Sequence, residues 1–242
     1  MATRQPASQK PMDDHDMQDV GYLRARAHHL RAAAASSRDP EIARAIAEAL
    51  RSAGRRPYLV PHGASDTLGA MGYALAAEEI VAQCPDVAWI VHASGSAGTQ
   101  AGLLAGLLAL RHPARVIGVD VDAQAERVAR DVRRVGREAA ALLGVGDRWD
   151  DRCVEVAGAW CGSAYGVPDA ATLEAIGLAG RLEGLALDPV YAGKGMAGLI
   201  GLARAGRFAG TGPVVWVHTG GVPGLFAYPA AMGRVGSLVN WS

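Results

Sequence analysis

A turn of six small residues separates two apolar stretches of the chain: Ser94, Gly95, Ser96, Ala97, Gly98 and Thr99. Where a strand leads through such a turn into a helix, backbone N–H groups and the helix dipole attract an anion. The glycines let the backbone approach a phosphate, and the serine and threonine hydroxyls can donate hydrogen bonds. No Lys-Ser/Thr pair of a Walker loop follows, and the turn does not match GxGxxG. The sequence therefore predicts a phosphate site, with tight packing of a helix start as the alternative.

Composition excludes several classes of function. The 242 residues carry 24 basic and 24 acidic side chains, and a nucleic-acid-binding domain is usually strongly basic. Three cysteines without a CxxC pair predict neither disulfides nor a structural zinc, and they indicate a reducing, cytoplasmic location. The seven histidines lack the spacing of metal ligands, so no metal site is predicted.

No membrane segment is predicted. The most apolar helical stretch, residues 101–110, is far shorter than the ~20 residues that span a bilayer. The first 38 residues are polar and do not have the pattern of a signal peptide, so we expect a partly disordered leader with some helix.

The periodicity of apolar residues predicts alternating helices and strands. The expected helices cover 39–54, 66–84, 98–110, 123–143, 172–182 and 196–205, with Ser65 or Asp66 capping the second. The expected strands cover 56–61, 87–91, 114–120 and 152–158, and residues 213–221 form the last strand and the turn that follows it. Several strands are continuously apolar, which is typical of a parallel sheet covered on both faces. The fold class is therefore α/β, with a doubly wound, mainly parallel sheet. An antiparallel arrangement around residues 87–91 would contradict it.

Four segments in this order resemble the family of D-cysteine desulfhydrase and 1-aminocyclopropane-1-carboxylate (ACC) deaminase: RPYLVPHGASDTLGAMGYALAAEEI, HASGSAGTQAGLLAGL, AYGVPDAATLEAIGLAGRLEGLALDPVYAGKGMAGLI and VVWVHTGGVPGLFAY. The resemblance covers residues 39–228 and leaves 229–242 as a tail. It implies the fold type II (tryptophan-synthase-β-like) architecture and the cofactor pyridoxal 5'-phosphate. In that family the SGSAGT turn holds the cofactor phosphate. The resemblance therefore implies that the predicted anion is the phosphate group of pyridoxal 5'-phosphate.

The resemblance also assigns roles to single residues. Tyr191 and Tyr165 match tyrosines on the substrate side of the cofactor, although buried packing would explain both equally well from the sequence. Thr219 matches the threonine that faces the pyridine nitrogen in the desulfhydrases. Ala192 stands where the deaminases carry glutamate and the desulfhydrases threonine, so it fits neither branch fully. The run RVARDVRRVGRE is most simply a solvated helix face.

The lysine content limits the chemistry. The family's Schiff-base lysine lies in a GGNK segment that these 242 residues do not contain, and the chain has only Lys10 and Lys194. Lys194 matches the lysine of the family's DPVY-x-GK motif, which is not the Schiff-base residue. The chain thus resembles the C-terminal two-thirds of such an enzyme.

Several functions stay open. One is a lyase that eliminates sulfide or sulfite from a small amino acid such as D-cysteine or cysteate, inactive alone without that lysine. Others are a non-catalytic phosphate-binding module, a subunit that needs a separate lysine-bearing chain, and an ACC deaminase. The resemblance implies a homodimer or such a separate N-terminal fragment as partner, and neither nucleic acid nor membrane.

Overall fold

The computed structural model describes residues 40–229, 231 and 233, and it divides the chain into two compact units, 1–60 and 61–242. In the first unit, helix α2 (Pro40–Ser52) confirms the helix expected over 39–54. The strand expected over 56–61 is wrong, because these residues form neither helix nor strand. Pro57 and Pro61 lack the N–H groups that a strand gives to a ladder.

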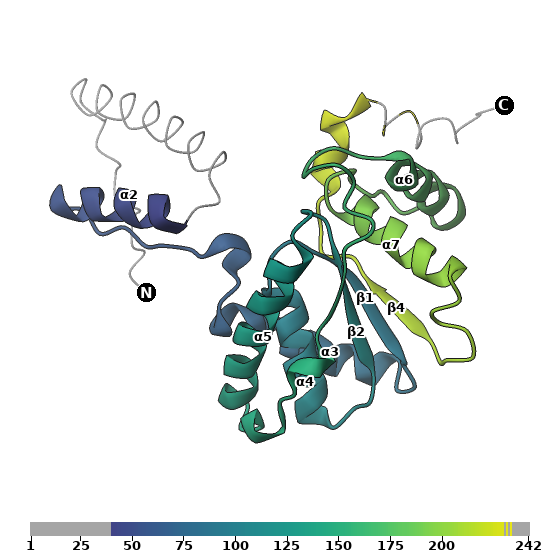
Figure 1. The fold of residues 1–242 in the computed structure, drawn as a ribbon, viewed down its shortest axis with the longest axis horizontal. Coiled ribbons are helices and arrows are strands. Elements are labelled where there is room, and N and C mark those ends of the chain that lie inside the picture. Colours follow the sequence, from purple (N-terminus) through teal and green to yellow (C-terminus); the bar gives the residue numbers. More distant parts are fainter. Residues whose placement is uncertain (1–39, 230, 232, 234–242) are drawn as a thin grey trace, which may run out of the picture. The chain divides into compact units, whose positions relative to one another are not determined.

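The second unit contains a sheet of four parallel strands (Figure 1). The strands are β1 (Trp89–Ser94), β2 (Arg115–Asp120), β3 (Glu155–Ala157) and β4 (Val214–Val217), in the order β3-β2-β1-β4. Strand β1 pairs in parallel with both β2 and β4, which confirms the predicted class of sheet. Every residue of β1 is buried, as expected for a central strand covered on both faces.

Helices cover both faces of this sheet. Figure 1 shows α3 (Thr67–Gln83), α4 (Gly98–Leu110) and α5 (Ala125–Leu142) on one side, and α6 (Ala170–Glu183) and α7 (Ala192–Arg204) on the other. Short 3-10 helices connect them at His62–Ala64, Gly146–Arg148, Asp151–Cys153 and Val222–Ala227. The glycines of α4 permit its close contact with α3, since a Cβ at Gly102 would overlap the carbonyl oxygen of Ala70.

Several element boundaries differ from the sequence-based expectation, and two of these differences have a local cause. Strand β3 has three residues instead of the seven expected, because Asp150 accepts a hydrogen bond from the Arg152 backbone and starts a 3-10 turn. Helix α7 begins four residues before the expected position 196, because Asp188 caps its first turn.

In the part of the chain that the structure describes, no helix has both the length and the apolar character needed to cross a membrane. The expected leader, 1–38, and most of the expected tail, 229–242, lie outside the described residues. The three expected domain boundaries therefore stay predictions.

Candidate functional site

The turn that follows β1 leaves several backbone donors free. Ala97 is the N-cap residue of α4 and is buried. Its side chain has no atom that could accept a hydrogen bond from the first turn of the helix. Within the described residues, the backbone N–H groups of Ser96, Ala97 and Thr99 have no hydrogen-bond acceptor. Ser94, also buried, donates its hydroxyl to the carbonyl oxygen of Ser96 at 3.3 Å. A helix N-terminus with free N–H groups is suited to an anion.

A second loop packs against this turn. The Gly98 N–H donates to the hydroxyl oxygen of Ser65 at 3.0 Å, so Ser65 closes one of the free donors at the start of α4. Gly63 has φ +65°, and a Cβ there would overlap the side chain of Ser96. Asp66, the other expected cap residue, accepts from the Gly69 N–H at 2.7 Å and caps α3. The sequence indicated a helix cap at this position, but it did not indicate that the Ser65 hydroxyl accepts a hydrogen bond from the 94–99 turn.

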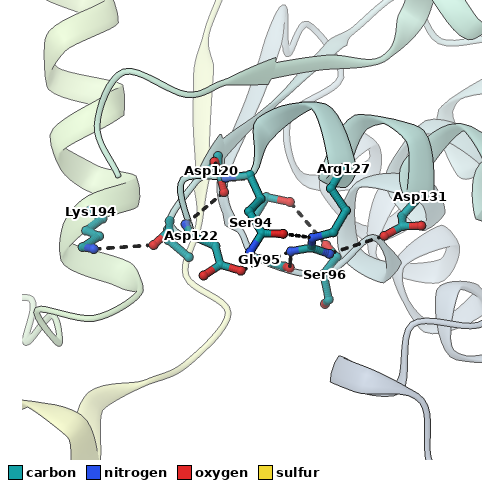
Figure 2. A network of polar contacts seen from close by, with 10 residues as sticks. Ser94, Gly95, Ser96, Asp120, Asp122, Arg127, Asp131 and Lys194 are labelled. Atoms are coloured by element: carbon teal, nitrogen blue, oxygen red, sulfur yellow. Dashed lines mark hydrogen bonds and ion pairs between the residues drawn. The ribbon is translucent and has the colours of Figure 1, made fainter. Parts of the chain in front are cut away.

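Arg127 holds the turn from the side of α5. Its Nη2 donates to the carbonyl oxygen of Gly95 at 3.3 Å and pairs with Asp122 at 3.1 Å, while its Nη1 lies 3.4 Å from Asp131 (Figure 2). The Asp122 side chain is only 3% exposed, so this pair is far less screened than a surface ion pair. The interpretation of residues 127–138 as a solvated helix face is therefore wrong for Arg127, which the charge pattern alone did not separate from its neighbours.

Tyr191 connects three of the predicted site residues. Its hydroxyl donates to the carbonyl oxygen of Ala93 at 3.1 Å, and a Cβ at Gly95 would lie 3.3 Å from its ring. Burial raises the pKa of Tyr191 to about 12, whereas the backbone N–H of Gly95 and the hydroxyl of Thr219 act in the opposite direction. Tyr191, Gly95 and Thr219 therefore lie together, although they come from α7, the β1–α4 turn and the segment after β4.

Asp188 fixes the place of Tyr191. Its carboxylate accepts the backbone N–H groups of Val190, Tyr191 and Ala192 at 2.8 to 2.9 Å. The turn that carries Thr219 also approaches it, since Gly221 has φ +102° and a Cβ there would overlap the Asp188 carboxylate. One buried carboxylate thus joins the DPVY and HTGG motifs, a role that the sequence did not indicate.

Tyr165 lies at the edge of this group. It belongs to the loop between β3 and α6, is 49% exposed, and, like Tyr73 of α3, contributes to raising the pKa of Tyr191. All predicted site residues thus fall at or near the carboxyl end of the sheet, and the roles given to them stay predictions.

Lys194 is fully buried beneath that loop. Its Nζ donates to the carbonyl oxygens of Ala164 at 2.7 Å and of Cys161, and lies 3.5 Å from that of Val121. Burial lowers the pKa of Lys194, an effect that the nearby Cys161 and the carboxylates of Asp169, Asp122 and Asp120 oppose. An amine with three carbonyl acceptors and no exposed surface is not available to react with a bound aldehyde.

The central strand β1 also carries a buried histidine. His92 of β1 is fully buried, and its Nδ1 lies 2.7 Å from the carbonyl oxygen of Ala93. Burial lowers the pKa of His92 to about 4, so its ring is neutral at neutral pH. The residues that the structure describes contain no group of three or more histidine, cysteine and acidic side chains placed to hold a metal ion.

A parallel sheet with a donor-rich turn at the carboxyl end of its central strand defines an α/β protein of the kind that binds ligands at that edge. The family model described as pyridoxal-phosphate dependent enzyme matches residues 16–220, and the chain belongs to this family. Its members use pyridoxal phosphate, in agreement with the cofactor predicted from the sequence.

The proteins to which this chain is similar belong to the family that its sequence motifs resemble. D-cysteine desulfhydrase of Yersinia enterocolitica is 43% identical over 192 residues, and that of Salmonella typhi 44% over 191; each match covers 76% of this chain and 56% of the relative. A crystal structure of an ACC deaminase homologue superposes with a TM-score of 0.70 and 36% identity, covering 82% of this chain and 59% of that one. The fold class is confirmed, and the chain spans a little over half the length of the curated relatives it matches.

Proposed function

We propose that this chain forms the phosphate-binding and substrate-facing part of a pyridoxal-phosphate-dependent lyase of the D-cysteine desulfhydrase type. The reaction would remove sulfide or sulfite from a small sulfur-containing amino acid, D-cysteine or cysteate, and yield ammonia and a keto acid. The observation that carries the proposal is the turn at the start of α4, with the free N–H groups of Ser96, Ala97 and Thr99.

The described residues fit the cofactor at three points. The turn offers the N–H groups of Ser96, Ala97 and Thr99 to a phosphate, whereas that of Gly98 is taken by the Ser65 hydroxyl. Thr219 presents a neutral hydroxyl beside Tyr191, which suits a weakly basic ring nitrogen that stays unprotonated. Tyr191 itself stays a neutral donor at neutral pH, because its pKa lies near 12. It can hold a proton in place but does not act there as a ready base.

When bound, pyridoxal phosphate supplies an aldehyde that takes up the amino group of an amino acid and a ring that withdraws electrons from its Cα. Moving the Cα proton requires a base with an accessible lone pair. Lys194 does not provide one, because its amine is enclosed by carbonyl oxygens. We infer that the 242-residue chain binds the cofactor by its phosphate and has little turnover by itself.

An ACC deaminase is the weaker alternative. The resemblance places Ala192 where the deaminases carry glutamate, and Ala192 is buried at the first turn of α7 with no functional group to offer. A chain that only binds the phosphorylated cofactor is the second candidate, favoured by the enclosure of Lys194.

The test uses 4'-deoxypyridoxine 5'-phosphate, in which a methyl group replaces the aldehyde, so that binding does not depend on any lysine. Calorimetric titration of the 242-residue chain should show saturable binding at one site. Ser96→Asp places a carboxylate at the turn, and like charges ~4 Å apart repel by roughly 1–4 kcal/mol, so affinity should fall about tenfold or more.

The matched control is Thr211→Asp. Residue 211 precedes β4 and lies at the amino edge of the sheet, away from the turn. It should leave the affinity unchanged. Equal losses in the two variants, or no binding by the parent chain, would contradict the proposed phosphate site.

A further inference from the structure

We propose that the ammonium group of Lys194 is an internal anchor that positions the loop bearing Tyr165, by holding its carbonyl oxygens against the segment that follows β2. The inference deepens the proposed function, since Tyr165 faces a substrate only if the cofactor binds beside it. Its evidence is geometric and concerns contacts within the chain itself.

The contacts of Lys194 join three parts of the chain that are far apart in sequence. The amine stands on the third residue of α7 and reaches the carbonyl oxygens of Cys161 and Ala164 in the β3–α6 loop. The carbonyl oxygen of Val121, just after β2, lies 3.5 Å away, and Figure 2 shows the side chain reaching across to this segment. The ammonium group thus connects α7, the loop and the end of β2.

A buried ammonium group at the position of Lys194 is energetically unfavourable unless other polar groups stabilise its charge. A cation in the first turn of a helix opposes the helix dipole, and burial removes its hydration. The carbonyl oxygens of Cys161, Ala164 and Val121 replace water around the amine. The acidic groups that act on it are Asp169 at the start of α6, Asp120 at the end of β2 and Asp122 just after that strand. Such an arrangement binds the loop carbonyls more strongly than a neutral donor would.

The loop also has contacts besides those with the amine, such as the N–H of Val167 that donates to the carbonyl oxygen of Ala164. Ser163, Ala164 and Tyr165 are exposed, and on the far side the Tyr228 hydroxyl donates to the carbonyl oxygen of Gly166 at 2.8 Å. Gly162 has φ +68°, and a Cβ there would lie only 2.9 Å from the carbonyl oxygen of Val167, so glycine permits the turn of the chain beside the amine. The ammonium group therefore attaches residues 161–164 at both ends of this stretch.

The reactivity of Cys161 reports the order of this loop. The thiol donates to the carbonyl oxygens of Gly158 and Gly162, and the other two cysteines of the chain, Cys84 and Cys153, can be replaced by serine to leave one thiol. In this background Lys194→Met keeps all but the last atom of the side-chain length and removes the charge. We expect the thiol to react with a small disulfide reagent about tenfold faster or more, the factor that corresponds to about 1.4 kcal/mol.

Electrostatics alone would act the other way, since losing a neighbouring positive charge disfavours the reactive thiolate. The control is Arg204→Met, which removes a cation from the exposed end of the same helix. In Arg204→Met the Cys161 thiol should react within about twofold of the parent rate, because a twofold change corresponds to only about 0.4 kcal/mol. Equal rates for Lys194→Met and the parent would overturn the proposal.

Chemical rescue separates anchoring by charge from simple filling of space. In Lys194→Ala, added n-propylammonium should slow the Cys161 reaction back towards the parent rate with saturation, whereas n-propanol of the same size should not. Equal rescue by both would assign Lys194 a packing role only and contradict the proposal.

A measurement on the unaltered chain covers the case in which the variants do not fold. Only two lysines occur in the sequence, so isotope-labelled lysine gives two side-chain signals in NMR spectra. The signal of Lys194 should be that of a charged amine whose protons exchange slowly with water at neutral pH. Two rapidly exchanging amines, or a neutral one, would overturn the proposal. None of these readouts uses the cofactor, so failure of the analogue to bind would refute the proposed function and leave this result standing.

Discussion

The hydroxyl of Tyr191 donates a hydrogen bond to the carbonyl oxygen of Ala93 at 3.1 Å, across 98 positions of sequence. This bond attaches the residue before α7 to the end of strand β1, next to the SGSAGT segment. It places a phenol next to Gly95 and Thr219, which the sequence resemblance had assigned to one site.

Replacing Tyr191 by phenylalanine should lower the free energy of unfolding by about 1 kcal/mol, the usual contribution of one such hydrogen bond. Urea denaturation measures the change. Tyr58→Phe serves as the control, because Tyr58 is 85% exposed and its replacement should leave stability within about 0.5 kcal/mol. If the two variants lose the same stability, the Tyr191 bond contributes nothing.

The same phenol should titrate late. Burial raises the pKa of Tyr191 to about 12, above the value near 10 of an unfolded tyrosine. The folded chain therefore binds this proton more tightly, and the associated stability is complete below pH 10 and is lost as the pH rises towards 12. The ultraviolet absorbance of phenolate, compared between the parent and Tyr191→Phe, should show one of the six tyrosines titrating in this late range. Identical curves below pH 11 and a difference above it are expected.

Arg127 should affect anion binding without touching the anion. Replacing it by glutamine removes the donor to the Gly95 carbonyl oxygen and the pair with Asp122, so the turn is held less firmly. We expect the affinity for 4'-deoxypyridoxine 5'-phosphate to fall about threefold to tenfold, or about 0.7–1.4 kcal/mol. Arg130→Gln, on the exposed face of the same helix, is the matched control. An equal effect of both variants would indicate only a change in net charge.

The order of elements could be predicted from periodicity because each helix and strand of the second unit carries its own apolar pattern. The parallel sheet follows from buried strands such as residues 89–94. Residues 56–61 show where local pattern fails, because a strand exists only if a neighbouring strand pairs with it, and local sequence does not supply that partner.

The site could be predicted only where its residues are contiguous or where the family motif marks them. The turn at 94–99 has its own local signature. Arg127, Asp188 and Ser65 become part of the site through tertiary contacts, with Gly95, Gly221 and Gly98 respectively, and no local spacing indicates those contacts. Lys194 illustrates the same limit, since its enclosure depends on a loop that lies 30 residues earlier.

The purified 242-residue chain should release little or no sulfide from D-cysteine with excess pyridoxal phosphate, because the amine of Lys194 is enclosed and no other described residue offers one. General acid–base transfer by such a group is worth about 10²–10⁴-fold in rate. Supplying a segment with the family's GGNK motif from a relative, fused to the chain or as a second chain, should produce a yellow species that borohydride reduces and should raise sulfide release. The same segment with its lysine changed to alanine is the control and should do neither. Rapid sulfide release by the chain alone, abolished in Lys194→Met while the fold persists, would show instead that Lys194 is the reacting lysine.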